Sequence, residues 1–130
     1  MDNAMFRHGA FSWCELMTTD VEAAKQFYTT LLGWTTEDVS VVEGMTYTVV
    51  KAGEEGIGGM MALTHCAPGT PPHWANYITV DDVDAVARKA QELGATTLVP
   101  ATDIPNVGRF YTFRDPQGAV ISVITYVRPA

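Results

Sequence analysis

A carboxylate within an otherwise apolar stretch is the first side chain in this sequence that could do chemistry. Glu15 lies in the stretch FSWCELMT, where Trp13 and Met17 flank it at two-residue spacing on the same face of a predicted strand. A carboxylate in such surroundings resists ionisation unless it is paired. Glu15 could act as a general base or accept a hydrogen bond from a substrate N–H or O–H. The alternative is an ion pair with Arg109 or Arg114, and the sequence favours neither.

Other side chains could line a binding surface. His73 and Tyr77 share one face of a second predicted strand, HWANYITV, but His73 borders a Pro-rich segment and we expect it to be structural. Trp13 together with the pair Met60 and Met61 would give a soft apolar lining suited to a flat or aromatic molecule. Because neighbouring residues on a strand face opposite ways, one of the two methionines must pack in the core.

Two helices and eight strands are predicted to position these side chains. The first helix begins after a capping Asp20 and ends at Gly33, and the second begins after Asp82 and ends at Gly94. Their apolar stripes are Ala24, Phe27, Tyr28 and Leu31 in the first helix and Val83, Val86, Ala90 and Leu93 in the second. Strands are expected at residues 10–18, 35–42, 45–51, 58–63, 73–80, 96–100, 110–113 and 119–126.

The order of these elements repeats along the chain. Asp20-Val21 and Asp82-Val83 open the two helices 62 positions apart (82 − 20), and a Pro/Gly-rich joint at residues 65–72 separates the halves. The sequence therefore predicts one α+β domain over residues 1–130, made of two βαβββ units at about 9–64 and 73–127. We expect paired curved mixed sheets around a cleft, with the helices outside.

Charge and composition limit the partners. Eight Lys and Arg against fifteen Asp and Glu give a net charge of −7, which repels phosphate backbones and anionic lipids. We therefore expect a small-molecule ligand and neither nucleic acid nor membrane as a partner. Cys14 and Cys66 lack CxxC spacing and are expected to be unreactive thiols, which suits a cytoplasmic location.

Three motifs in order resemble the vicinal oxygen chelate superfamily, which includes glyoxalase I, extradiol dioxygenases and bleomycin- and fosfomycin-resistance proteins. DVEAAKQFYTTLLGW is similar to the family's D-x-x-x-x-x-x-FY-x-x-x-LG-W/F segment, FRDPQGAVISV is similar to its DP-x-G-x-x-x-E-L ending, and VDDVDAVARKAQELGA matches its second-half helix. The resemblance covers about residues 9–127 and is strongest to uncharacterised single-domain members that begin G-x-F-x-W-x-E-L. It implies a glyoxalase-like fold.

The resemblance also implies where a metal site would lie. Metal-dependent members place His or Glu ligands on four strands around a divalent ion that polarises vicinal substrate oxygens. These positions fall here on Trp13, Ala75 and Ser122, with only Met60 or Met61 on the fourth strand. None is a usual ligand for such an ion, so we expect no metal cofactor. A displaced site for Ni, Zn, Fe or Mn that uses Glu15 and His73 is left open.

The sequence thus predicts a binding protein for a small, largely apolar or aromatic molecule in the inter-sheet cleft. The expected lining is Trp13, Glu15, Met60, Met61, His73, Tyr77 and Ser122. The alternative is an enzyme, either a lyase or isomerase of glyoxalase type or a dioxygenase, with a non-standard metal site or with Glu15 as base. A homodimer is expected, because one chain would leave strand edges uncovered and Met5 and Phe6 could dock on a partner.

Overall fold

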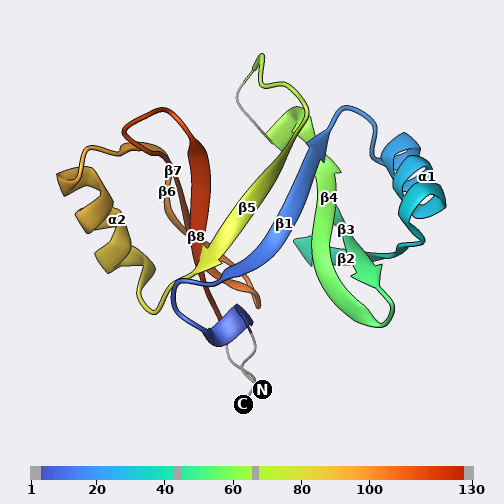
Figure 1. Cartoon of the computed structure of the whole chain (residues 1–130), viewed down its shortest axis with the longest axis horizontal. Helices are drawn as coiled ribbons and strands as arrows, with labels where there is room; N and C mark the ends of the chain where they lie inside the picture. Colours follow the sequence, from blue (N-terminus) through green and yellow to red (C-terminus); the bar gives the residue numbers. More distant parts are fainter. Residues whose placement is uncertain (1–3, 43–44, 66–67, 128–130) are drawn as a thin grey trace. The chain divides into compact units, whose positions relative to one another are not determined.

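The protein has the predicted α+β fold, with the order strand, helix and three strands occurring twice. The computed structural model describes residues 4–42, 45–65 and 68–127. The elements are β1 (Phe11–Thr18), α1 (Val21–Leu32), β2 (Thr35–Val42), β3 (Met45–Ala52), β4 (Glu55–Ala62), β5 (His73–Thr79), α2 (Val83–Glu92), β6 (Thr96–Ile104), β7 (Gly108–Arg114) and β8 (Val120–Tyr126) (Figure 1). The chain divides into a central unit, Trp13–Ala75, and a terminal unit that joins the residues up to Ser12 to those from Asn76 onward.

The predicted capping signals of both helices are confirmed. The Asp20 side chain accepts a hydrogen bond from the Ala23 backbone N–H at 3.0 Å. Gly33 ends α1 with a φ of 72°. The Asp82 side chain accepts from the Ala85 N–H at 3.1 Å. A side-chain oxygen at each N-terminus thus satisfies a backbone donor that the helix leaves unpaired.

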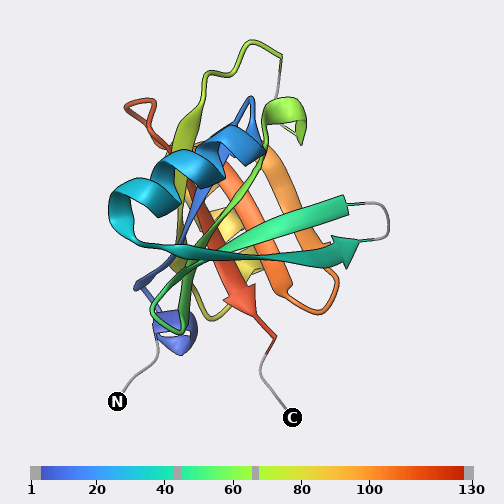
Figure 2. The same cartoon turned by 90° about the vertical axis from the view of Figure 1, so that its right-hand side faces the viewer.

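The central unit is a four-stranded sheet with α1 against one face. Its strand order is β2-β3-β4-β1, with β1 and β4 parallel and the other pairs antiparallel. Figure 2 shows β2 and β3 side by side as a long hairpin. Leu16, Val50 and Met60 form the core beneath α1. Val21, Ala24, Tyr28 and Trp34 pack against this core.

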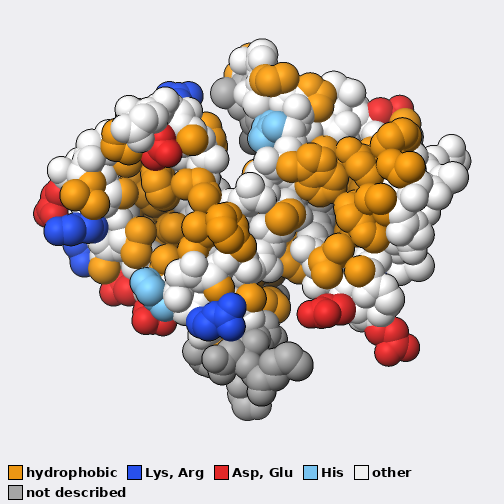
Figure 3. Space-filling model, in the orientation of Figure 1, with side chains coloured by type: hydrophobic (Ala, Val, Ile, Leu, Met, Phe, Trp, Pro, Cys, Tyr) orange, Lys and Arg blue, Asp and Glu red, His pale blue; other side chains and the backbone are white. Residues whose placement is uncertain are grey.

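The apolar stripe predicted for α1 is only partly correct. Ala24 and Tyr28 pack on the core as expected, but Phe27 is 59% and Leu31 62% exposed. The helix is rotated so that Val21, Ala24 and Tyr28 face the sheet, which places Phe27 and Leu31 on its outer side. In Figure 3 hydrophobic side chains gather on the right-hand side, where Figure 1 places α1 and β4.

The terminal unit repeats the arrangement with strand order β5-β8-β7-β6 and a parallel β5–β8 pair. Its core contains Val80, Val83, Ala87, Tyr111 and Val123. Leu93, predicted to be part of the α2 stripe, is exposed because the helix has ended at Glu92. Among the described residues, no helix is long and apolar enough to cross a membrane.

The N-terminal segment belongs to the terminal unit. The Gly9 N–H donates to the Thr79 carbonyl at 2.7 Å, and the Thr79 N–H donates to the Ala10 carbonyl at 2.8 Å. The Thr79 hydroxyl also donates to the Ala4 carbonyl at 2.8 Å. Met5 and Phe6 are half-buried in this arrangement. The terminal unit thus already covers part of Met5 and Phe6. Their apolar side chains therefore give no reason to expect a partner chain.

Candidate functional site

The main candidate site lies on the face of the central sheet opposite α1. Trp13 on β1 donates its indole N–H to the Tyr47 hydroxyl on β3 at 2.8 Å, and both side chains are half-buried. The Tyr47 ring lies over Gly59 on β4, since a Cβ at Gly59 would overlap the phenol oxygen and Cζ. An indole and a phenol are thus held together across the three strands.

Glu15 lies on the same face of β1 as Trp13. It is 8% exposed, and its register partner on the parallel strand β4 is Gly59. Glu15 therefore lies directly across from Gly59, the residue over which the Tyr47 ring lies. Arg109, a possible ion-pair partner suggested by the sequence, bonds to Asp84 and Asp103.

The two adjacent methionines have separate environments. Met60 is 0% exposed and packs with Leu16 and Val50 in the core beneath α1. Met61 is half-buried and points to the opposite face because side chains alternate along β4. Its register partner on β1 is Met17. The structure therefore places Met60 in the core and leaves Met61 as the candidate lining residue.

His73 has a structural contact at the start of β5. Its Nδ1 lies 2.7 Å from the Pro71 carbonyl oxygen, a distance at which an Nδ1–H donates to the carbonyl. The neighbouring Trp74 packs against the Tyr28 and Trp34 rings, at centroid distances of 5.4 Å and 6.1 Å. The ring of Trp74 therefore belongs with the aromatic residues on the α1 side of the central unit.

Ser122 and Tyr77 lie in the terminal unit, on the face opposite α2. Ser122 is 4% exposed, and its hydroxyl lies 2.6 Å from the hydroxyl of Thr112 on β7. Tyr77 is the register partner of Ser122 across the parallel β5–β8 pair. The Tyr77 and Phe110 rings are in edge contact at 6.5 Å. This face therefore combines a hydroxyl pair with aromatic rings.

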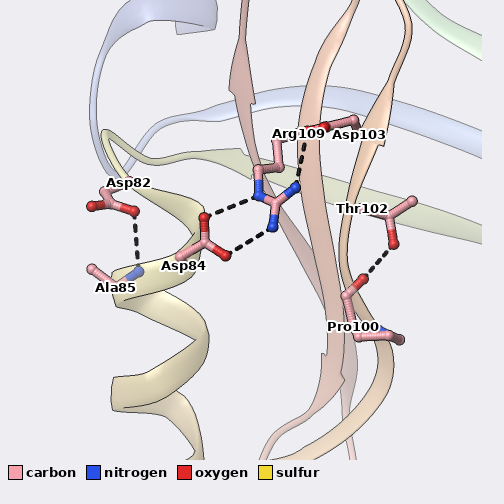
Figure 4. Close-up of polar contacts among 7 residues, drawn as sticks. All are labelled: Asp82, Asp84, Ala85, Pro100, Thr102, Asp103 and Arg109. Atoms are coloured by element: carbon pink, nitrogen blue, oxygen red, sulfur yellow. Dashed lines mark hydrogen bonds and ion pairs between the residues drawn. The ribbon is translucent and has the colours of Figure 1, made fainter.

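The terminal unit also contains an open cavity of about 500 Å³ near the start of α2. Arg109 on its wall donates two hydrogen bonds to Asp84, at 2.9 and 3.0 Å, and a third to Asp103 at 3.0 Å (Figure 4). The hydrogen bonds from Arg109 lower the pKa of Asp84, and the two carboxylates raise the pKa of Arg109. Through these three hydrogen bonds Arg109 ties α2 to β6 and β7.

Comparison with known proteins identifies the family. The sequence model of the Glyoxalase/Bleomycin resistance protein/Dioxygenase superfamily matches residues 10–123. The chain belongs to this superfamily. This confirms the resemblance seen in its motifs.

Curated relatives extend beyond the matched region. This chain is 41% identical over 116 residues to "Putative glyoxylase CFP32" of Mycobacterium tuberculosis, and the match covers 89% of this chain and 44% of that protein. It is 29% identical over 130 residues to "Anthracycline biosynthesis protein DnrV" of Streptomyces peucetius, covering 91% of this chain and 47% of that protein. The chain thus spans about half the length of these relatives.

Solved structures support the glyoxalase-like fold. Methylmalonyl-CoA epimerase from Mycobacterium tuberculosis matches with a TM-score of 0.65 at 15% identity, covering 95% of this chain and 91% of that one. The 2,3-dioxygenase LapB from Pseudomonas sp. KL28 matches with a TM-score of 0.63 at 17% identity, covering 95% of this chain and 42% of that one. At these identities the likeness extends to the fold alone.

The side chains of this superfamily member do not fit the metal site that the resemblance implies. Trp13 offers an indole N–H that is bonded to Tyr47, and Ala75 has no donor atom. The Ser122 hydroxyl is bonded to Thr112. Within the residues that the structure describes, no three His, Cys, Asp or Glu side chains lie close enough together to hold a metal ion. The donor set therefore does not match a divalent ion.

Sequence reasoning missed Tyr47 and Thr112. Each bonds through its side chain to a predicted site residue that strand pairing brings close. Tyr47 bonds to Trp13, 34 residues away, and Thr112 bonds to Ser122, ten residues away. The alternation of β3 could have indicated the face of Tyr47, but its partner depends on the register of β1, β4 and β3. The glycines of β4 were the available signal, since a glycine within a strand often marks a close approach of another group to the backbone.

Proposed function

We propose that this superfamily member binds a small, largely apolar or aromatic molecule on the face of the central sheet opposite α1, without a metal ion. The observation that carries the proposal is the hydrogen bond from Trp13 to Tyr47. It places an oriented aromatic pair at the position where the resemblance implies a metal ligand. Met61 would add an adaptable apolar surface, and Glu15 could accept a hydrogen bond from a polar group of the ligand.

Ser122 and Tyr77 are proposed as a separate candidate binding face on the terminal unit, and His73 is retained as a less favoured candidate. DnrV offers independent support for the ligand class. By its name that relative takes part in anthracycline biosynthesis, and anthracyclines contain flat fused rings. A flat or partly aromatic molecule is therefore a reasonable class of ligand for this chain.

Titration calorimetry with two neutral compounds of similar size, 2-naphthol and its saturated counterpart decahydro-2-naphthol, tests the proposal. At least one compound should bind with one-to-one stoichiometry. Trp13→Ala should weaken that binding about tenfold, because it removes the aromatic surface of the site. Trp74→Ala is the matched control, since it removes an equally large ring from the α1 side. Binding of neither compound, or equal losses in both variants, would reject the proposed site.

A second candidate is an enzyme of the glyoxalase or dioxygenase type, which the 41% identity to CFP32 favours. It would use a metal ion at a non-standard site or Glu15 as general base. Calorimetric titration with nickel, zinc and manganese separates the two candidates. Stoichiometric tight binding that Glu15→Ala abolishes would favour the enzyme, whereas the metal-free binding protein should give no such signal.

We also propose that the chain forms a homodimer through the outer side of α1. Phe27 and Leu31 are exposed there on neighbouring turns, and such apolar patches commonly mark interfaces. Light scattering should report twice the 14.1 kDa chain mass. Leu31→Glu should give a monomer, whereas Leu93→Glu, which alters an equally exposed leucine on the terminal unit, should leave the dimer intact. A monomeric wild-type protein at high concentration would contradict the proposal.

A further inference from the structure

The contact between Trp13 and Tyr47 depends on the absence of a side chain at Gly59 on β4. The phenol ring occupies the space directly over Gly59, where a Cβ would overlap it. Gly56 lies beside the indole, and a Cβ there would be 3.9 Å from Trp13 Cη2 and 3.5 Å from Val49 Cγ1. These are ordinary van der Waals distances, so only Gly59 is required by the aromatic pair.

The hydrogen bond fixes the orientation of the indole. A half-buried tryptophan without a partner for its N–H could turn to follow ligands of different shapes. Trp13 instead keeps its N–H on Tyr47 at 2.8 Å, and the phenol lies directly over Gly59. A flat surface that is already ordered loses little side-chain entropy when a second ring stacks on it. A thick saturated ligand gains less from a surface that cannot adjust to it.

We propose that Tyr47 is a specificity-determining residue that makes the site prefer a flat aromatic ligand over a saturated ligand of the same size. The inference rests on the proposed function and names its ligand class more narrowly. The net charge of −7 further favours a neutral or cationic ring system over an anionic one. Gly59 supports this selectivity because it provides the space that Tyr47 occupies.

The test compares 2-naphthol with decahydro-2-naphthol in four proteins. The wild type should bind the aromatic compound about tenfold more tightly. Tyr47→Phe keeps the ring but removes the acceptor, and Gly59→Ala displaces the ring. Both should reduce the preference to about twofold. Gly56→Ala is the matched control, because its added methyl group fits, and it should retain the full preference.

A second measurement reports on the indole itself. The three tryptophans give three indole N–H signals in a ¹⁵N correlation spectrum, and Trp13→Phe identifies one of them. That signal should shift and exchange faster with solvent in Tyr47→Phe but not in Gly56→Ala. If Gly59→Ala does not fold, Tyr47→Phe still decides the result. Equal binding of both compounds to the wild type, or an unchanged preference in Tyr47→Phe, overturns this inference and leaves the proposed function standing. Binding of neither compound overturns both.

Discussion

Replacing Gly58 with alanine is expected to lower the free energy of unfolding by about 3 kcal/mol, because the new methyl group has no space in the sheet. A Cβ at Gly58 would overlap the carbonyl oxygen of Cys14, its register partner on β1. A backbone oxygen that takes part in strand pairing cannot turn aside as a side chain can. The parallel β1–β4 pair would have to separate locally, close to the core contact between Leu16 and Met60.

Urea denaturation measures the loss, and Gly56→Ala on the same strand is the control. The methyl group at residue 56 meets Val49 and Trp13 only at ordinary distances. That variant should stay within about 1 kcal/mol of the wild type and could be slightly more stable. If the two variants were equally stable, the close packing of β1 and β4 at Cys14 would be incorrect.

Alanine substitution of the two adjacent methionines, one at a time, should mainly lower stability at Met60 and mainly weaken ligand binding at Met61. Met60→Ala is expected to lose about 2–5 kcal/mol of stability, since it leaves a cavity in a fully buried site. Met61→Ala should lose about 1 kcal/mol or less, because the side chain is half-buried on the opposite face. Binding of 2-naphthol should weaken about threefold in Met61→Ala, as an adaptable apolar contact is removed.

Chemical denaturation and calorimetry on both variants provide the measurement. Binding by Met60→Ala must be tested well below its unfolding midpoint, where it should remain close to the wild-type value. The reverse pattern, with a stability loss only in Met61→Ala and a binding loss only in Met60→Ala, would mean that the faces of β4 are wrongly assigned.

Local signals predicted most of the fold. Asp20, Gly33 and Asp82 determine helix ends through bonds within a few residues, so their positions could be read directly. The turn after β7 is similar, since Asp115 Oδ1 accepts from the N–H groups of Gln117 and Ala119, and Gly118 takes a φ of 101°. Features of this kind, in which a residue bonds to a partner a few positions away, can be read from the sequence alone.

Strand limits were less predictable because pairing partners determine them. β6 continues through Pro100 to Ile104, beyond the predicted end at residue 100. It lies at the outer edge of the terminal unit's strand order and, within the part of the chain that the structure describes, pairs only with β7, with register shifts on either side of Val99. A proline is tolerated on an edge strand, where its missing N–H removes no ladder bond. β4 likewise begins at Glu55 and β7 at Gly108, earlier than predicted.

The candidate site was the least predictable part. The sequence pointed to Trp13, Glu15 and Ser122, but it could not indicate that Tyr47 accepts a hydrogen bond from the indole. That contact requires the register of three strands and a glycine at one position. It could not decide between Met60 and Met61 either, because alternation shows that two neighbours face opposite ways without showing which one faces the core.

The division of the chain has a consequence for its synthesis on the ribosome. Residues 13–75 form the central unit from one continuous segment, so every strand partner within it is available once that segment has emerged. Gly9 and Ala10 are made before this segment, yet they bond to Thr79, some seventy positions later. Pairing of Gly9 and Ala10 must therefore wait until Thr79 has been made, and the central unit can fold before that pairing forms.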